Sequence, residues 1–348
     1  MGFSDWTWDI LNISLFFKGD MSDFPESKKG KTFFLNSSNV KNVRINHLHS
    51  YLKILTGNLS KEVLETIEGR NYDFILISAP ELIFLIGSLR ANFKARVKVF
   101  VHDLGIQSYH PYSIFFRNSI GKTIAVDEIL ADSEKTSTEL EKFLKSHRLS
   151  FSSDLIKIAW LTIDYNQYRK ISKQEARKFL SLPENIPIFL SVGSPSKNLK
   201  NVIKALNLIN LEDFNFLRIG RIPVELSALM SENLKSKTRI AMNVKDEEML
   251  YYYNAADLLL FPSILEGFGL EILEAIACEV PVLIADFEPM RTIAGKCALK
   301  IKDPNNQTEM RDVLSEFISN KELFLKECDY NLIKSRFNNE KFIKIIQE

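Results

Sequence analysis

The chain has 348 residues, which is long for a single hydrophobic core and predicts two domains of ordinary size. Its 45% hydrophobic and 26% charged residues are typical of a globular protein and exclude a disordered one. A formal net charge of +1 gives no overall electrostatic reason to expect nucleic acid as a partner.

Cysteine usage and apolar runs indicate the compartment. Three scattered cysteines are too few for a disulfide framework or a zinc site, so we expect free, buried thiols in a reducing environment. No apolar run approaches the length that a bilayer requires, and the N-terminal residues lack the pattern of a signal peptide. These features predict a cytoplasmic protein.

In the first half of the chain, a regular pattern of helices and strands can be recognised only after residue 50. Helices are expected over 51–67 and 80–89, and buried strands over 72–78 and 97–101. Short apolar strands that alternate with helices are typical of a parallel sheet with helical crossovers. The first domain is therefore expected to be α/β.

His102 and Asp103 follow directly after the strand expected over 97–101. Ligands of open α/β sheets collect beyond the carboxyl ends of the strands, so this is a place where a side chain can meet a ligand. Either His102 lines such a site, or its imidazole hydrogen-bonds the local turn. A basic run beside it (Arg90, Lys94, Arg96 and Lys98) is either a solvated helix end and loop, which is favoured, or a contact with anionic lipid.

The remainder of the first domain leads to a boundary. A strand over 129–133 feeds a helix that begins with Ser133 or Thr136 as its cap. The last strand is expected over 156–160. We place the domain boundary near 165–180, because prolines then punctuate the start of a new pattern.

The second domain opens with a strand over 188–192, a loop over 193–198 and a helix over 199–209. A nucleoside diphosphate needs positive charge, which a helix N-terminus with Lys197 at its entrance supplies without a metal ion. The alternative for Lys197 is a solvated loop lysine. Further strands are expected over 216–220, 239–242 and 280–284, and Asp246 is expected to cap a helix that runs to about residue 254.

The most informative stretch covers residues 258–278. An apolar strand over 258–261 passes through a turn with Gly267 and Gly269 and becomes a helix, with Leu270, Leu273 and Ala277 expected on one side. Backbone amides in such a loop can face an anion or a sugar hydroxyl.

Two carboxylates flank this turn. Glu266 lies just before it, and Glu274 lies in the first turns of the helix. One can address a reacting sugar and the other a diol further along the ligand. For Glu274 the alternative is an exposed glutamate on the helix surface, and Glu271, three residues before it, serves as an internal comparison.

The segment from Glu266 to Glu274 follows Phe-Pro-Ser, encloses Gly-Phe-Gly-Leu and is followed by Pro281-Val282. This pattern resembles the E-x7-E signature of retaining nucleotide-sugar glycosyltransferases of family four. The resemblance implies an α/β protein of the GT-B fold, with two Rossmann-like domains that face each other across a cleft. It divides the chain into an acceptor-side domain (1–168), a nucleotide-sugar-binding domain (169–330) and a C-terminal helix that packs back towards the first domain (331–348).

The resemblance also implies an activity. A hexose would move from a UDP- or GDP-linked sugar to a glycan, lipid or small-molecule acceptor, with retention and with neither a metal nor a further cofactor. Glu266, His102 and Lys197 are the implied catalytic residues. The implied donor-binding residues are Gly193, Ser194, Lys197, Asn198, Val244, Gly267, Phe268, Gly269, Leu270 and Glu274.

The chain departs from the family pattern in three places, and the first and the last of them keep a second interpretation open. Ser194 stands where an arginine is usual, the loop that contains it is shorter, and Arg221 is a candidate for the missing charge. Glu279 stands where relatives have glycine, which predicts a less tight turn. The glycine-rich loop of the acceptor side is not found in the first fifty residues. The alternative is a non-catalytic GT-B subunit that binds a nucleotide sugar or a glycan beside an active partner.

Overall fold

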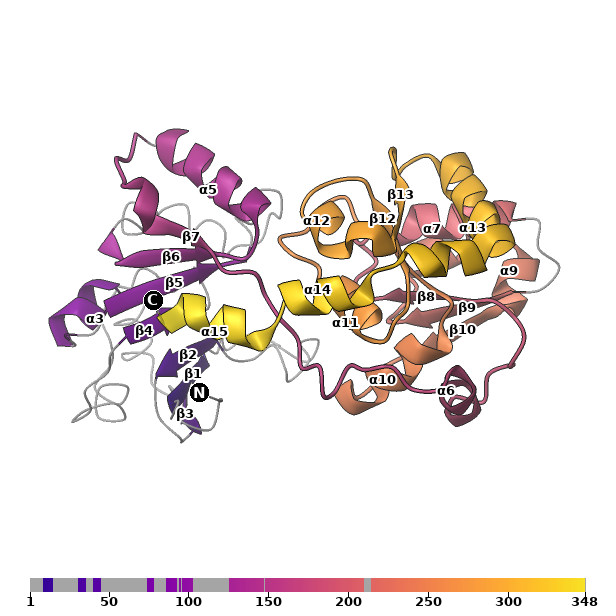
Figure 1. Cartoon of the computed structure of the whole chain (residues 1–348), viewed down its shortest axis with the longest axis horizontal. Coiled ribbons are helices and arrows are strands. Elements are labelled where there is room, and N and C mark those ends of the chain that lie inside the picture. Colours follow the sequence, from indigo (N-terminus) through magenta and orange to yellow (C-terminus); the bar gives the residue numbers. More distant parts are fainter. Residues whose placement is uncertain are drawn as a thin grey trace. The chain divides into compact units, whose positions relative to one another are not determined.

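The computed structural model describes residues 9–14, 31–35, 40–44, 74–77, 86–92, 94, 96–102, 125–146, 148–209 and 214–347. The chain separates into two compact units, Met1–Ala159 and Trp160–Glu348 (Figure 1). The division falls before the predicted boundary at residue 168. The predicted packing of the last helix against the first domain stays a prediction.

The first unit is built on a seven-stranded sheet. In spatial order its strands are β3 (Val40–Arg44), β1 (Asp9–Ser14), β2 (Lys31–Leu35), β4 (Phe74–Ile77), β5 (Arg96–Val101), β6 (Glu128–Ala131) and β7 (Ile156–Ile158). Strand β2 runs antiparallel to both of its neighbours, β1 and β4, whereas the other pairs are parallel. The sheet is therefore mixed and not wholly parallel as predicted, an arrangement that is common in large α/β sheets.

Two helices of this unit are described, α3 (Ile86–Asn92) and α5 (Glu134–Ser146). The Ser133 hydroxyl accepts a hydrogen bond from the Thr136 amide at 3.1 Å, which confirms Ser133 as the cap of α5. Helix α3 continues past the predicted end at residue 89. The helix predicted over 51–67 and the start of the one predicted over 80–89 lie outside the described residues.

The basic run beside β5 is largely neutralised by carboxylates. Lys98 is fully buried, with its Nζ 2.7 Å from Glu128 Oε2, and Arg90 Nη2 lies 2.7 Å from Asp127 Oδ2. A buried, paired lysine cannot meet a lipid headgroup. Lys98 therefore does not belong to a lipid-binding surface, and the predicted membrane contact is left with the more exposed members of the run.

The second unit contains a six-stranded sheet whose described pairs are all parallel. The spatial order is β10-β9-β8-β11-β12-β13, which is the doubly wound order 3-2-1-4-5-6 of a Rossmann-like domain. The five strands predicted in this half are confirmed, within a residue or two of the expected ends, and a sixth strand, β13, was not predicted. Their bounds are Ile188–Val192 (β8), Asn215–Ile219 (β9), Thr238–Ala241 (β10), Leu258–Phe261 (β11), Val282–Ala285 (β12) and Ala298–Ile301 (β13).

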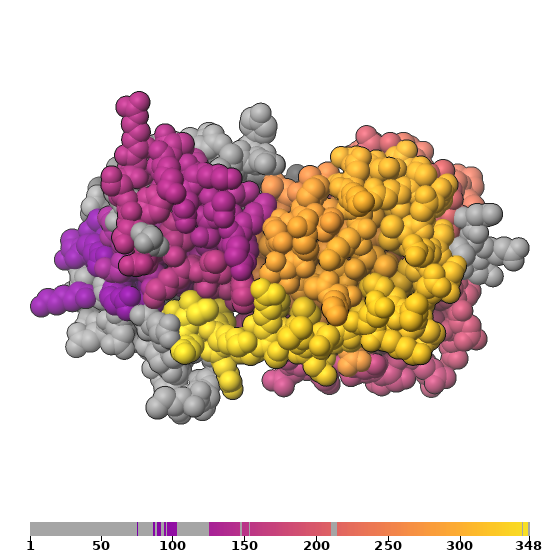
Figure 2. Space-filling view, turned by 45° about the horizontal axis from the view of Figure 1, so that its top comes forward, coloured from indigo at the N-terminus to yellow at the C-terminus, as the bar shows by residue number. Residues whose placement is uncertain are grey.

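Helices cover both faces of this sheet (Figure 1). One face packs against α6 (Lys173–Phe179), α10 (Asp246–Ala255), α11 (Leu270–Ala277), α12 (Met290–Ala294) and α14 (Tyr330–Arg336). The other packs against α7 (Leu199–Leu208), α9 (Glu232–Ser236) and α13 (Gln307–Glu327). Helices α8 (Val224–Ser227) and α15 (Asn339–Gln347) complete the unit. In the space-filling view the orange and yellow segments that carry α11 to α14 form one continuous surface (Figure 2).

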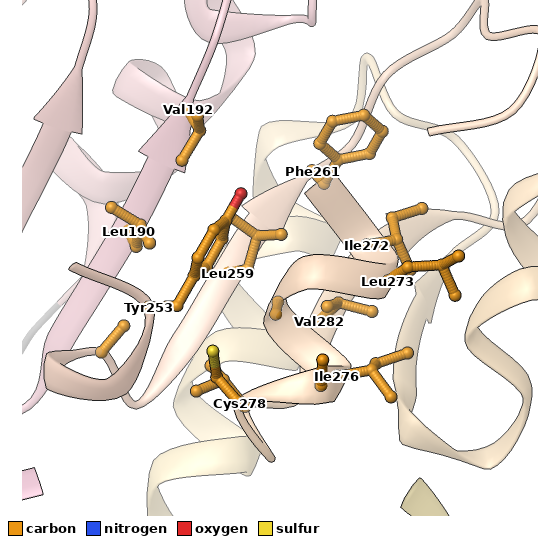
Figure 3. Packing of buried hydrophobic residues seen from close by; sticks show 14 of the residues in the cluster. Leu190, Val192, Tyr253, Leu259, Phe261, Ile272, Leu273, Ile276, Cys278 and Val282 are labelled. Atoms are coloured by element: carbon orange, nitrogen blue, oxygen red, sulfur yellow. The ribbon is translucent and has the colours of Figure 1, made fainter. Parts of the chain in front are cut away.

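Helix α11 buries Leu273 and Ala277, two of the three residues that were predicted to share one side. Ile272, Leu273 and Ile276 are buried where α11 packs on β11 and β12, whereas Leu270 is 37% exposed (Figure 3). The expectation that Leu270 shares the buried side is wrong, because it occupies the first helical position, beside the turn and away from the strands.

The turn after α11 is as tight as a glycine would make it. Glu279 has φ +58°, its amide donates to Ile276 O and the Val280 amide donates to Ala275 O, both at 2.9 Å. These two bonds are those of a Schellman motif, in which the residue after the helix is left-handed. The predicted loosening is therefore wrong, and Glu279 adopts the strained conformation while its carboxylate pairs with Lys170.

The predicted cap of α10 is also wrong. Lys245 occupies the cap position without a side-chain hydrogen bond, and Asp246 is the first helical residue. An acidic residue in the first turn still suits the positive end of the helix dipole.

Cys278, Cys297 and Cys328 are free thiols. Among the described helices, none is both long and apolar enough to cross a membrane.

The amino edge of the second sheet is held by a buried carboxylate. Asp257 accepts hydrogen bonds from the Ile188 amide at 2.8 Å and from Arg177, Lys173 and Lys321 at 2.5–2.7 Å. Burial alone raises the pKa of Asp257, but Lys173 and Lys321 outweigh it and bring the pKa down to about 2. This network ties α6 and α13 to the start of β8 and stabilises the fold.

Candidate functional site

The topology of the second sheet determines where a ligand can bind. Strands β9 and β10 follow β8 on one side of the sheet, and β12 and β13 follow β11 on the other side. The strand order therefore reverses between β8 and β11. Ligands of doubly wound sheets occupy the crevice beyond the carboxyl ends of the strands at such a switch point. The two loops singled out in the sequence, after Val192 and after Phe261, both begin there.

The loop after β8 depends on two glycines. Gly193 has φ +94°, and its amide donates to Ile219 O at 3.1 Å. Gly220, with φ +110°, lies so close that a Cβ added to it would be 2.8 Å from Gly193 O. Side chains are excluded from this approach, and the loop is therefore fixed against the end of β9.

Lys197 lies between two carboxylates. Its Nζ is 2.6 Å from Glu271 Oε1 and 3.4 Å from Glu266 Oε1, and it sits 4.6 Å from the centroid of the Phe261 ring. The predicted residues Lys197 and Glu266 are thus brought together, and Lys197 is not the solvated loop lysine of the alternative reading. Glu271 was assigned no role, yet it makes the shorter contact. Its place in the first turn of α11, two residues after Gly269, was the signal that could have identified it.

The carboxyl group of Glu266 has a raised pKa. Burial raises the pKa of its carboxyl group, Lys197 and the Ser263 hydroxyl act against that rise, and the nearby charge of Glu271 adds to it. The side chain is only 13% exposed, and its Oε1 lies 3.4 Å from Lys197 Nζ. A buried carboxyl group with a raised pKa at a sheet switch point is typical of a functional site.

Glu274 faces the interior of the domain. The hydroxyl of Tyr253, a fully buried residue on α10, donates a hydrogen bond of 2.5 Å to Glu274 Oε2. Burial, followed by the charge of Glu271, raises the pKa of Glu274 to about 7, although hydrogen bonds from Tyr253 and Tyr168 act against the rise. Glu274 is therefore not an exposed helix-surface glutamate. The sequence did not indicate Tyr253, which lies on another helix.

Other residues predicted to bind the donor have clear structural partners. Asn198, with φ +63°, donates from its side-chain amide to Pro262 O at 3.1 Å and Pro304 O at 2.7 Å, so it joins the two loops. Phe268 is buried against Phe337, with ring centroids 5.8 Å apart. Both side chains hold the loops in place, and their contact with a ligand stays a prediction.

The remaining donor candidates lie at the same edge. Ser194 is exposed and accepts a hydrogen bond from the Ser196 hydroxyl at 2.8 Å, and Val244 is half-buried. Gly269 has φ +108° and starts α11, and Gly267 precedes it in the loop. Arg221 is exposed after β9, and its predicted role as a replacement charge stays a prediction.

In the first unit, His102 lies at the carboxyl end of β5, as predicted. Its Nδ1 is 3.8 Å from Oδ2 of Asp132, at the end of the adjacent strand β6, and its ring stacks on Phe100 with centroids 4.7 Å apart. Burial raises the pKa of Asp132 in spite of His102, and its Oδ1 has no hydrogen-bond partner among the described residues. The sequence had paired His102 with Asp103, which lies outside the described residues, and had missed Asp132.

A search of the described residues for a metal site finds no group of three or more His, Cys, Asp or Glu side chains that could hold an ion. The functional groups at the carboxyl edge of the second sheet are instead two glycine turns, one lysine and three glutamates. Such a set can bind a ligand that carries both an anionic part and hydroxyl groups.

Residues 172–334 match the family described as glycosyl transferases group 1. This segment is therefore similar to the domain of group 1 glycosyltransferases. It includes every residue of the second unit that was assigned to the site, from Gly193 to Glu274, so the family match and the geometry concern the same part of the chain.

Several curated relatives of this chain are mannosyltransferases. The serotype-specific mannosyltransferase WbdA of Escherichia coli is 25% identical over 229 residues, which cover 61% of this chain and 27% of WbdA. The O-antigen chain mannosyltransferase RfbU of Salmonella typhimurium is 26% identical over 183 residues, covering 49% of this chain and 51% of RfbU. The matches thus span between a quarter and about half of these relatives.

The fold resembles solved glycosyltransferases over most of the chain. HepE from Anabaena, solved with UDP and glucose, superposes with a TM-score of 0.72 at 16% identity and covers 88% of this chain and 84% of HepE. Sucrose-phosphate synthase from Thermosynechococcus elongatus gives 0.68 at 18% identity, covering 82% and 75%. The GT-B class with two Rossmann-like domains is confirmed, whereas a cleft between the domains stays a prediction.

Proposed function

We propose that the chain is a retaining glycosyltransferase that moves a hexose from a UDP- or GDP-linked sugar to a glycan, lipid or small-molecule acceptor. The observation that carries the proposal is the position of Lys197 at the switch point, between Glu266 and Glu271 and beside the left-handed Gly193. A cation, two glycine turns and a buried carboxylate meet there at one edge of the sheet.

In the proposed reaction the bond between the anomeric carbon and a diphosphate oxygen breaks. A bond forms between that carbon and an acceptor oxygen on the same face, and the acceptor proton passes to the leaving phosphate. Negative charge grows on the phosphate, so Lys197 and the amides of the Gly193 and Gly269 turns stabilise the transition state. Glu266, which is largely buried, accepts hydrogen bonds from hydroxyl groups of the transferred sugar and orients it.

Glu274 has a different task in the proposal. A carboxylate suits a ribose diol, because each of its two oxygens can accept from one hydroxyl group. In the structure one of these oxygens already accepts from Tyr253, which fixes the orientation of the group. The first unit contributes His102, oriented by Asp132, as the predicted contact with the transferred sugar, and the acceptor is expected to bind on that side.

The relatives suggest which sugars to test first. Because WbdA and RfbU are mannosyltransferases and HepE was solved with UDP and glucose, mannose and glucose are the first hexoses to try, on GDP and UDP. The alternative, a non-catalytic nucleotide-sugar-binding subunit, is favoured by one contact. Lys197 is already neutralised by Glu271 at 2.6 Å, and a lysine in that state can bind a diphosphate without driving its departure.

Replacement of Glu266 or Lys197 tests the proposal. In a donor-hydrolysis or transfer assay, Glu266→Ala and Lys197→Ala are each expected to lower kcat by two to three decades, because a well-placed charged contact contributes about 2–4 kcal/mol to the transition state. Glu232→Ala, at a side chain that is 90% exposed on α9, is the control and should keep the wild-type rate. Near wild-type turnover in either site variant would overturn the assignment, and nucleotide binding without any hydrolysis would favour the binding subunit.

A further inference from the structure

Arg218 is a buried cation directly behind the loop after β8. It is 1% exposed and lies on β9, where its Nη1 donates to the Ser191 hydroxyl at 3.0 Å and its Nη2 donates to Gly193 O at 2.5 Å. The side chain shares the strand face of Phe216, which packs on α7, because residues two apart on a strand point the same way. The guanidinium therefore lies beneath the start of α7.

No carboxylate among the described residues pairs with Arg218. Within the described part of the chain, its two partners are a hydroxyl group and a carbonyl group, and its Nε has no hydrogen-bond partner. Burial lowers its pKa to about 10, so the group keeps its charge near neutral pH. A buried charge without a counter-charge costs free energy, and native structures keep such a group where a ligand supplies the missing charge.

The same domain contains a buried arginine with an ordinary structural role. Arg177 is 3% exposed at the amino edge, where its Nη2 lies 2.6 Å from Asp257 Oδ2. Arg177 thus has the carboxylate that Arg218 lacks. The unpaired Arg218 thus lies at the carboxyl edge of the sheet, where ligands bind, and the paired Arg177 lies at the amino edge.

The loop after β8 lacks the net positive charge that a diphosphate requires. Lys197, the cation on its outer side, contacts both Glu266 and Glu271, so the described charged groups around it sum to one negative charge before a ligand arrives. Ser194 adds no charge. Gly193 lies between the two cations, since a Cβ on it would touch the Lys197 stem at 3.4 Å while its carbonyl accepts from Arg218.

We infer that Arg218 is the positioning residue of the donor's diphosphate: it fixes the Gly193 carbonyl, and with it the start of the loop, and supplies the positive charge behind the loop. The inference rests on the proposed function and deepens it, because it names the charge that the phosphate loop otherwise lacks. It also replaces the sequence expectation for Arg221 with a residue three positions earlier, whose side chain points into the loop and not into solvent.

The test compares ligands that differ only in phosphate number. Wild-type protein, Arg218→Met, Arg218→Lys and the matched control Arg177→Met are titrated calorimetrically with UDP, UMP and uridine, and with GDP, GMP and guanosine. Arg218→Met should weaken diphosphate binding about 10- to 100-fold, monophosphate binding less, and nucleoside binding by less than about twofold, because charge-assisted contacts act on the phosphates alone. Arg218→Lys should recover part of the loss. Arg177→Met should lower the Tm and leave the three affinities in their wild-type ratio.

The outcomes separate this inference from the proposed function. Equal weakening of nucleoside and diphosphate by Arg218→Met, or unchanged diphosphate affinity, overturns the inference and leaves the proposed function standing. Absence of binding of all six ligands to the wild-type protein overturns both. Should Arg218→Met fail to fold, Arg218→Lys decides by the same comparison, since it keeps the charge and loses one of the two hydrogen bonds.

Discussion

The two edges of the second sheet hold buried charge in opposite ways. At the amino edge one carboxylate, Asp257, is surrounded by three cations and its pKa is lowered to about 2. At the carboxyl edge one cation, Lys197, lies between two carboxylates, and the pKa of Glu274 is raised to about 7. Both oxygens of Asp257 accept hydrogen bonds, so we call the network at the amino edge saturated. At the carboxyl edge two carboxylates share one lysine, so we call that network conflicted.

The difference indicates what each edge is for. A saturated network is satisfied in the free protein, so its contribution goes into the stability of the fold. In a conflicted network, repulsion between like charges lowers the stability of the free protein, and a bound ligand of complementary charge offsets that cost. Strongly shifted pKa values gather at functional sites for this reason. The amino edge is thus structural, and the carboxyl edge is arranged for an anion and for hydroxyl groups.

The largest expected effect comes from breaking the saturated network. Asp257→Asn leaves the buried Arg177 without its carboxylate and should lower the free energy of unfolding by about 3–5 kcal/mol. Chemical denaturation at pH 7 measures it. Lys321→Met, which removes a 33% exposed cation from the same carboxylate, is the matched control and should cost less than about 1 kcal/mol. A loss of nucleotide affinity in folded Asp257→Asn protein would contradict the separation of the two edges.

The next effect is the pH dependence that Glu274 imposes. Its pKa rises from 4.5 in the unfolded chain to about 7 in the folded one, so its contribution to stability is complete below pH 4.5 and is lost as the pH rises through about 7. The loss amounts to about 3 kcal/mol. Glu274→Gln, which cannot ionise, should remove this slope from unfolding curves measured between pH 4 and 8.

The same variant sharpens the ligand side of the comparison. Because an ionised carboxylate accepts from both hydroxyl groups of a ribose, nucleotide affinity should rise with pH through about 7 in the wild type, and this rise should vanish in Glu274→Gln. Glu232→Gln on the exposed surface of α9 is the control, with both profiles unchanged. An identical pH profile of stability in the wild type and in Glu274→Gln would mean that Glu274 does not titrate in this window.

Much of this site could be read from local sequence. The runs at 188–192 and 258–261 are short, apolar and followed by glycine, so the strand, the loop and the start of the helix were each predicted to within a residue or two. Local signals suffice when a strand, its turn and its helix are consecutive in the chain. They also placed Lys197 and Glu266 at one edge, because parallel strands end at the same edge.

The residues that sequence reasoning missed make contacts between distant segments. Lys197 meets Glu271 across 74 positions, Arg218 reaches the loop from the next strand, and Tyr253 binds Glu274 from another helix. Periodicity describes which face of an element is buried, and it does not say which side chains meet across elements. Glu279 shows the converse limit, because tertiary packing imposed a left-handed turn on a residue whose own preference opposes it.

The smallest effect tests whether the contact between Lys197 and Glu271 competes with the ligand or prepares for it. If the carboxyl edge is conflicted, Glu271 competes with the diphosphate for Lys197, and Glu271→Gln should tighten UDP or GDP binding by about two- to fivefold, or roughly 0.5–1 kcal/mol for a partly exposed pair. Since the charge of Glu271 also raises the pKa of Glu266 and Glu274, the variant should move the stability loss of Glu274 to lower pH. Glu271→Asp keeps the charge and should bind like the wild type. Weaker diphosphate binding in Glu271→Gln would instead mean that Glu271 holds Lys197 in position, and the carboxyl edge would then be a preformed ion pair like the one at the amino edge.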